Sequence, residues 1–219
     1  KMIGPEKQRE FLSSLGFTKP TSIEMIEASG GKPLLPRRWN ELETMTISYG
    51  HGLSATPLHL ATGYATLANG GRLVKPTLLE EEKLGLGQQI ISKEVAKNSL
   101  AMLRGVVTEG TASLADVNGY FVAGKTGTAD KPSAQGGYDK EKNITSFASI
   151  FPIHEPKYVL VVTLDEAQDT SGPEPKRTAG WTAVPVSAEI IARVAPLLGL
   201  RPKFDNKSSV GVTLSNWQE

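Results

Sequence analysis

The chain has 219 residues, a formal net charge of +1, 39% hydrophobic residues and 21% charged residues. This composition is ordinary for a globular protein, and the small net charge gives no reason to expect nucleic acid as a partner. The absence of cysteine excludes a disulfide framework, a cysteine nucleophile and thiolate metal sites. No apolar run approaches the roughly 20 residues of a membrane helix. The polar N-terminus also lacks a signal-peptide core, so we expect any export signal or membrane anchor to lie outside this chain.

Helices are predicted in the first half of the chain. Three segments combine a capping residue or a proline at their start with apolar residues at helical spacing. They are residues 5–16, 54–71 and 92–108. In the second of these, Thr56 is a good N-cap and Pro57 suits the first helical position, and Ser92 is the expected cap of the third. Residues 17–47 are rich in proline and glycine, and we expect loops there.

The pattern changes in the second half. Runs rich in β-branched and aromatic residues predict three strands, followed by one amphipathic helix. The strands are 120–126, 143–152 and 158–166, and the helix is 184–200. The short connection before residue 158 implies an antiparallel hairpin, while the long polar segment 130–143 is expected to be a loop. Helices followed by consecutive strands and another helix predict an α+β fold with an antiparallel sheet flanked by helices.

One stretch, GYFVAGKTGTAD, supports two incompatible interpretations. Residues 119–126 match the phosphate-loop pattern G-x-x-x-x-G-K-[ST]. Asp165 and Glu166 at the end of an apolar run resemble the acidic end of a Walker B strand. Against this, a phosphate loop must curl and must open a helix, whereas its variable positions here favour extension and the residues after Thr126 are poor helix formers. We therefore prefer an extended strand and no nucleotide.

The second interpretation is a K-T-G element on a strand. Alternation places Lys125 and Gly127 on one face and Thr126 and Thr128 on the other. A twist or bulge near Gly127 is then needed for all of them to serve one cleft. An ammonium group beside two hydroxyls is a good receptor for a carboxylate, and a glycine lets a substrate backbone lie close to the strand.

Several segments together resemble the C-terminal part of the transpeptidase domain of class B penicillin-binding proteins, over about residues 5–199. The similarity lies in SYGHGLSATPLHLATGYATLANGG, GYFVAGKTGTAD, SFASIFPIHEPKYVLVVTLDEA and TAGWTAVPVSAEIIARV. The SYGHGL and TPL elements favour the septal, cell-division type over the elongation type. By this resemblance, residues 1–200 are the C-terminal part of that domain and residues 201–219 are a polar tail.

The resemblance implies D,D-transpeptidation of the peptidoglycan stem peptide through an acyl-serine, with β-lactam antibiotics as ligands and without a cofactor or metal. It assigns a catalytic role to Lys125 near the substrate carboxylate, and it assigns substrate binding to Thr126, Gly127 and Thr128. The Thr128 backbone N–H would form half of an oxyanion hole. The implied location is periplasmic or extracytoplasmic, anchored to the membrane through another segment. Division proteins are possible partners.

The chain also departs from the family pattern. The S-x-N motif is absent, and the one S-x-x-K match, Ser29 with Lys32, spans two glycines before Pro33. Such a segment is not expected to form the buried helix that lets the lysine take the proton of the serine. We therefore predict that the chain alone is inactive and that the N-terminal half of the same domain supplies the nucleophile. A non-catalytic wall-peptide or partner-binding module, and a β-lactam-binding hydrolase of the same superfamily, stay open as alternatives.

Four further residues are of types that often occur in functional sites. The three histidines, His51, His59 and His154, lack metal-ligand spacing, so no metal site is expected. Tyr138 lies in the long segment 130–143, and by the resemblance it is a possible contact of the substrate cleft.

Overall fold

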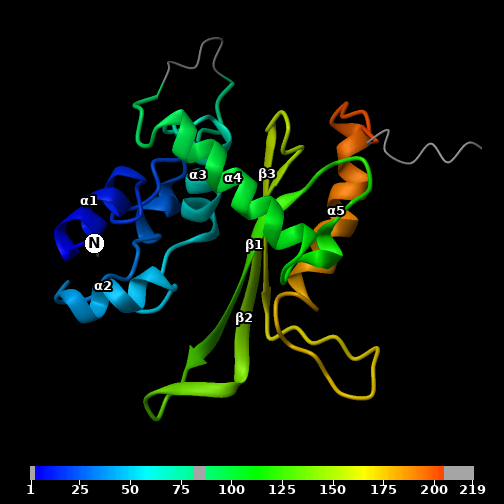
Figure 1. Cartoon of the computed structure of the whole chain (residues 1–219). Coiled ribbons are helices and arrows are strands. Elements are labelled where there is room, and N and C mark those ends of the chain that lie inside the picture. The colour runs from blue at the N-terminus through cyan, green and yellow to red at the C-terminus, as the bar shows by residue number, and fades with distance from the viewer. Residues whose placement is uncertain (1–2, 81–86, 205–219) are drawn as a thin grey trace, which may run out of the picture.

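The structure is a computed structural model that describes residues 3–80 and 87–204. Its centre is a three-stranded antiparallel sheet in the order β1-β2-β3. Helices lie on both sides of this sheet (Figure 1). The expected α+β class with an antiparallel sheet is confirmed.

The helices and strands follow one another along the chain much in the order that the sequence pattern predicts. The α-helices are α1 (Pro5–Ser14), α2 (Glu41–Ser48), α3 (Pro57–Ala68), α4 (Lys93–Thr108) and α5 (Ala183–Leu197). The strands are β1 (Ala123–Pro132), β2 (Tyr138–Phe151) and β3 (Tyr158–Asp165), with short 3₁₀ helices at Ile26–Gly30 and Ser113–Ala115. Thr56 caps α3 with Pro57 at its first turn, and Ser92 caps α4 through the Val95 N–H, as expected.

Helix α2 corrects the prediction of loops throughout residues 17–47. It begins with a capping box, in which the Asn40 side chain accepts hydrogen bonds from the Leu42 and Glu43 N–H groups, and the Glu43 side chain returns to the Asn40 N–H. The helix has only eight residues and a weak apolar stripe, so periodicity could not reveal it. The capping signature N-x-x-E was the available signal.

The sheet differs from the prediction at both ends of β1. The strand begins at Ala123 instead of residue 120, because Phe121 has a φ of 44° and breaks the extended backbone. At its other end β1 continues to Pro132, and β2 begins at Tyr138. The expected loop 130–143 is therefore largely strand, closed by a turn in which Gly136 and Gly137 have positive φ.

The main core lies on one face of the sheet, under α5. It brings together Phe147 and Val162 of the sheet with Val184 and Ile191 of α5. Helix α3 packs on β2 and β3 from the other face, so the two helices lie on opposite sides of the sheet (Figure 1). Strand β1 contacts α4 and keeps one edge without a strand partner in the described part of the chain. That edge carries the K-T-G element.

Within the described ranges, no helix combines the length and apolar character needed to cross a membrane.

Candidate functional site

The candidate site is the outer edge of β1. Residues 123–130 pair with β2 in an unbroken register, in which Lys125 lies opposite Ala148 and Thr126 opposite Phe147. The register shifts only between Asp130 and Lys131. Of the twist or bulge expected near Gly127, the bulge is therefore absent, and the lysine and the two threonines keep the alternation of a regular strand.

The two threonines face α5, and each is held by another part of the chain. The Thr126 and Thr111 hydroxyl oxygens lie 2.8 Å apart. The Thr128 hydroxyl accepts a hydrogen bond from the Ala179 N–H at 3.0 Å. Thr111 follows the end of α4, and Ala179 lies four residues before α5. The ends of both helices therefore orient the side chains of β1.

These groups line a groove of about 460 Å³ beside the strand. Its walls are the turn after α4, the threonine side of β1 and the segment before α5. The lining residues are Gly110, Thr111, Ser113, Leu114, Thr126, Thr128, Thr178, Ala179, Gly180 and Trp181. None of them is acidic or basic, so the groove offers neutral donors, and no carboxylate of its own wall would repel an anion.

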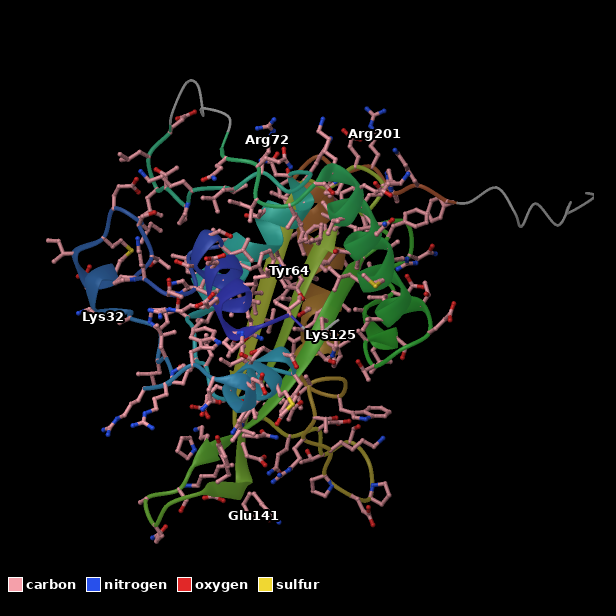
Figure 2. The ribbon with its side chains drawn as sticks, turned by 60° about the vertical axis from the view of Figure 1, so that its left-hand side comes forward. Lys32, Tyr64, Arg72, Lys125, Glu141 and Arg201 are labelled. Atoms are coloured by element: carbon pink, nitrogen blue, oxygen red, sulfur yellow. The ribbon has the colours of Figure 1, made fainter. Side chains whose placement is uncertain are left out.

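Lys125 reaches Thr126 around the edge of the strand. Its side chain is exposed, and its Nζ donates to the Thr126 carbonyl at 2.9 Å and to the Thr126 hydroxyl at 3.3 Å. Figure 2 shows Lys125 on β1 near the middle of the molecule. A flexible side chain folding over an open strand edge, and not a bulge, brings the cation and the hydroxyl together.

Gly127 lies beside open space. A Cβ atom added there would meet nothing within 4 Å, whereas one added at Gly124 would lie 2.5 Å from the Ala148 carbonyl oxygen. Packing within the described chain therefore requires a small residue at Gly124 and not at Gly127. The room above Gly127 is available to whatever approaches the edge of β1.

Arg104 fixes the start of β1, a role that no local pattern in the sequence indicates. From α4, its guanidinium donates to the Val122 carbonyl at 2.7 Å and forms an ion pair with Asp116 at 2.8 Å. It also lies over the Phe121 ring, 5.8 Å from the ring centroid. These contacts hold the turn at Phe121 and set the path of the strand that follows.

The other candidates are placed away from the threonine groove. Tyr138 contacts His51, with ring centroids 5.5 Å apart and its hydroxyl 3.3 Å from Nδ1. His59 is buried, with its Nδ1 2.8 Å from the Thr56 hydroxyl oxygen and its Nε2 2.7 Å from the Lys19 carbonyl oxygen. His154 packs on the Phe121 ring. No group of three or more metal-binding side chains occurs among the residues that the structure describes.

The S-x-x-K match does not form one helical turn of a catalytic motif. Ser29 lies in the 3₁₀ helix Ile26–Gly30, a short helix where none was expected, and Lys32 lies beyond its end. Lys32 is far from Lys125 in Figure 2, with the N-terminal helices between them in that view. The geometry supports treating this match as unrelated to the site on β1.

The phosphate-loop interpretation fails on the backbone. Lys125 and Thr126 are followed by six further strand residues instead of a helix, so no helix N-terminus faces a bound phosphate there. Asp165 ends β3 as an exposed residue that is ion-paired with Lys131, and Lys131 also contacts Glu166 at 2.7 Å. These two carboxylates raise the pKa of Lys131. They are the polar end of a strand, as preferred from the sequence.

Comparison with known proteins identifies the relatives of this chain. Residues 1–192 match the family described as "Penicillin binding protein transpeptidase domain". The chain is 32% identical to a protein of Caulobacter vibrioides named "Probable peptidoglycan D,D-transpeptidase FtsI", over 93% of this chain and 36% of that protein. It is 31% identical to stage V sporulation protein D of Bacillus subtilis, over 92% of this chain and 32% of the relative.

Solved structures similar to this chain are also penicillin-binding proteins. The transpeptidase domain of Burkholderia pseudomallei penicillin-binding protein 3 superimposes with a TM-score of 0.80 at 30% identity, covering 93% of this chain and 60% of that domain chain. Penicillin-binding protein 3 of Mycobacterium tuberculosis, complexed with aztreonam, gives 0.78 at 25% identity, covering 92% of this chain and 48% of its own. The chain therefore spans about a third of its curated relatives and about three-fifths of the Burkholderia structure.

Proposed function

This chain belongs to the penicillin-binding protein transpeptidase family, and we propose that it supplies the substrate-recognition strand of a peptidoglycan D,D-transpeptidase. The reaction is cross-linking of the stem peptide through an acyl-serine, and β-lactam antibiotics are alternative acylating ligands. One structural relative, penicillin-binding protein 3 of Mycobacterium tuberculosis, was solved in complexes with aztreonam and with ampicillin. The names of the curated relatives include FtsI peptidoglycan D,D-transpeptidases.

The observation that carries the proposal is the edge of β1. There, an exposed ammonium group, two hydroxyls held by the chain itself and an open position at Gly127 occur within four residues. Lys125 provides positive charge near the substrate carboxylate, and Thr126 and Thr128 donate hydrogen bonds to it. The Thr128 backbone N–H provides one of the two oxyanion donors, a contribution typically worth about 10²–10³ in rate.

The serine nucleophile and its base come from the remainder of the transpeptidase domain. This part of the proposal rests on the S-x-x-K match, whose geometry differs from one turn of a buried helix, and on the two-fifths of the Burkholderia domain that has no counterpart here. The site then lies between β1 and that remainder. We place the whole enzyme outside the cytoplasmic membrane, in wall synthesis at division, with other division proteins as partners.

The test is covalent labelling with a fluorescent penicillin. The chain alone is expected to give no stoichiometric adduct, because it lacks the acylated serine. The complete protein that contains this chain is expected to give one adduct, which peptide mapping places outside residues 1–219. The Ser29→Ala variant of the complete protein is the matched control and should label as the wild type does. An adduct on any serine of the isolated chain would contradict the division of labour proposed here.

A further inference from the structure

Thr111 hydrogen-bonds to a K-T-G threonine, and the family resemblance did not single it out. We propose that Thr111 is a positioning residue, whose hydroxyl donates to Thr126 and thereby leaves the Thr126 proton free for a carboxylate in the groove. This inference rests on the function proposed above, because it concerns how the same strand recognises its ligand. It is carried by the 2.8 Å separation of the two hydroxyl oxygens.

A hydroxyl carries one proton and two acceptor lone pairs. If Thr126 donated to Thr111, its proton would be used within the protein and could not bind an anion. If Thr111 donates, Thr126 becomes an acceptor toward Thr111 and a donor toward the groove. The direction of this one hydrogen bond therefore decides whether Thr126 can recognise a carboxylate.

The surroundings of Thr126 are compatible with the second arrangement. Lys125 Nζ, which can only donate, lies 3.3 Å from the Thr126 hydroxyl oxygen and uses one of its two lone pairs. With Thr111 as the donor to the other lone pair, the oxygen of Thr126 accepts from two sides and its own proton is left for the groove. Donors that act in series polarise one another, so a hydroxyl that already accepts hydrogen bonds is a better donor to an anion.

Thr128 repeats the arrangement one step along the strand. Its hydroxyl accepts from the Ala179 N–H at 3.0 Å, and an amide N–H cannot reverse this role. Its proton is therefore also free to point into the groove. Both threonines are prepared as donors by groups behind them, one by a backbone amide and one by Thr111. The lining of the groove holds no acidic side chain that would compete for these protons.

The experiment measures second-order acylation by a fluorescent penicillin in the complete protein. Thr111→Val keeps the shape of the side chain and removes its hydroxyl, whereas Thr111→Ser keeps the hydroxyl. Thr108→Val is the matched control, because the Thr108 hydroxyl bonds to the Arg104 carbonyl within α4 and not to β1. The Thr111→Val change is also made in a Thr126→Val background, which completes a double-mutant cycle.

Loss of one orienting hydrogen bond is expected to slow acylation about three- to tenfold in Thr111→Val. Thr111→Ser should restore most of the rate, Thr108→Val should leave it unchanged, and Thr111→Val should add no further loss when Thr126 is already valine. A wild-type rate in Thr111→Val, or the same loss in both backgrounds, would overturn the inference. A wild-type protein that no penicillin acylates would instead overturn the proposed function, and this inference with it.

Discussion

The two faces of β1 differ in how completely the chain supports the groups that they carry. On the face toward α5, Thr126 and Thr128 are each oriented by a partner from another segment, at 2.8 and 3.0 Å. On the face toward α3, the Lys125 ammonium group contacts only its own neighbour, Thr126, in the hydrogen bonds that the described residues provide. The two threonines of the K-T-G element are therefore oriented by this chain, whereas the Lys125 ammonium group is exposed and open to a further contact.

The difference indicates what each half contributes. Groups that are built into the surrounding hydrogen bonds contribute to folding as well as to binding, so changing them affects stability. A solvated charge at an open edge contributes little to folding and can act strongly on a ligand or on a neighbouring domain. Within the K-T-G element, the comparison thus predicts that the threonines affect stability more than Lys125 does, and that Lys125 affects the rate strongly.

The largest expected effect on stability concerns Tyr64, on the helix α3 that packs on β2 and β3 from the lysine side of the sheet. Burial raises the pKa of Tyr64, on α3, to about 12. The pKa of tyrosine in an unfolded chain is near 10, so the folded state favours the neutral phenol. The stabilisation from this difference is complete below about pH 10 and is lost as the pH rises through 12. The full loss in the free energy of unfolding is roughly 2.7 kcal/mol. Tyr64→Phe should lack this part of the alkaline destabilisation, measured by urea unfolding between pH 9 and 12.

Figure 2 shows Tyr64 near the centre of the molecule. If the wild type and Tyr64→Phe lost stability equally over this range, the Tyr64 hydroxyl would not be desolvated in the folded protein. The lysine side of the molecule would then be less firmly packed than this comparison of the two faces assumes.

A smaller loss in the free energy of unfolding is expected from Thr128→Val. The substitution removes the acceptor of the Ala179 N–H, and Ala179 is only 1% exposed. An unsatisfied buried amide costs about 1–3 kcal/mol, and we expect about 1–2 because water can reach the exposed side of Thr128. Denaturant unfolding measures the change, and Thr128→Ser is the control that keeps the acceptor. Equal stability of the valine and serine variants would show that this hydrogen bond does not hold the segment before α5.

The smallest stability effect belongs to Lys125→Ala. The side chain is exposed and lies at the strand edge, and substitutions of that kind usually change stability by no more than about 0.5 kcal/mol. Thermal unfolding of the wild type and the variant should therefore coincide within this margin. A loss comparable to that of Thr128→Val would mean that both faces of β1 are structural.

The sequence was sufficient for the elements with strong local signals. The caps at Thr56 and Ser92, the continuous apolar run of β3 and the amphipathic α5 each carry their own pattern, and each was placed to within a few residues. The strand character of the K-T-G element followed from its β-favouring residues and from the poor helix formers after it. The expectation of a twist or bulge near Gly127 came from an assumption about function and not from a backbone signal, and the register shows no bulge there.

The remaining features depend on contacts between distant segments. Arg104 reaches Val122 across 18 positions, and Thr111 reaches Thr126 across 15. Neither pair has a spacing that periodicity could detect. The start of β1 at Ala123 depends on the positive φ of Phe121, an uncommon conformation for a non-glycine residue. Such contacts become visible only when the packed chain brings the segments together.

Lys125 is proposed to act in recognition at the edge of β1 and not in folding. The most direct test of this role is the second-order rate of penicillin acylation for Lys125→Ala in the complete protein. Removing a charge-assisted contact worth about 1.5–3 kcal/mol predicts a rate roughly ten- to a hundredfold lower, and Lys125→Arg should recover only part of it, because its charge has a different geometry. Acylation of Lys125→Ala at the wild-type rate, or a loss explained by unfolding, would contradict the role assigned to this strand.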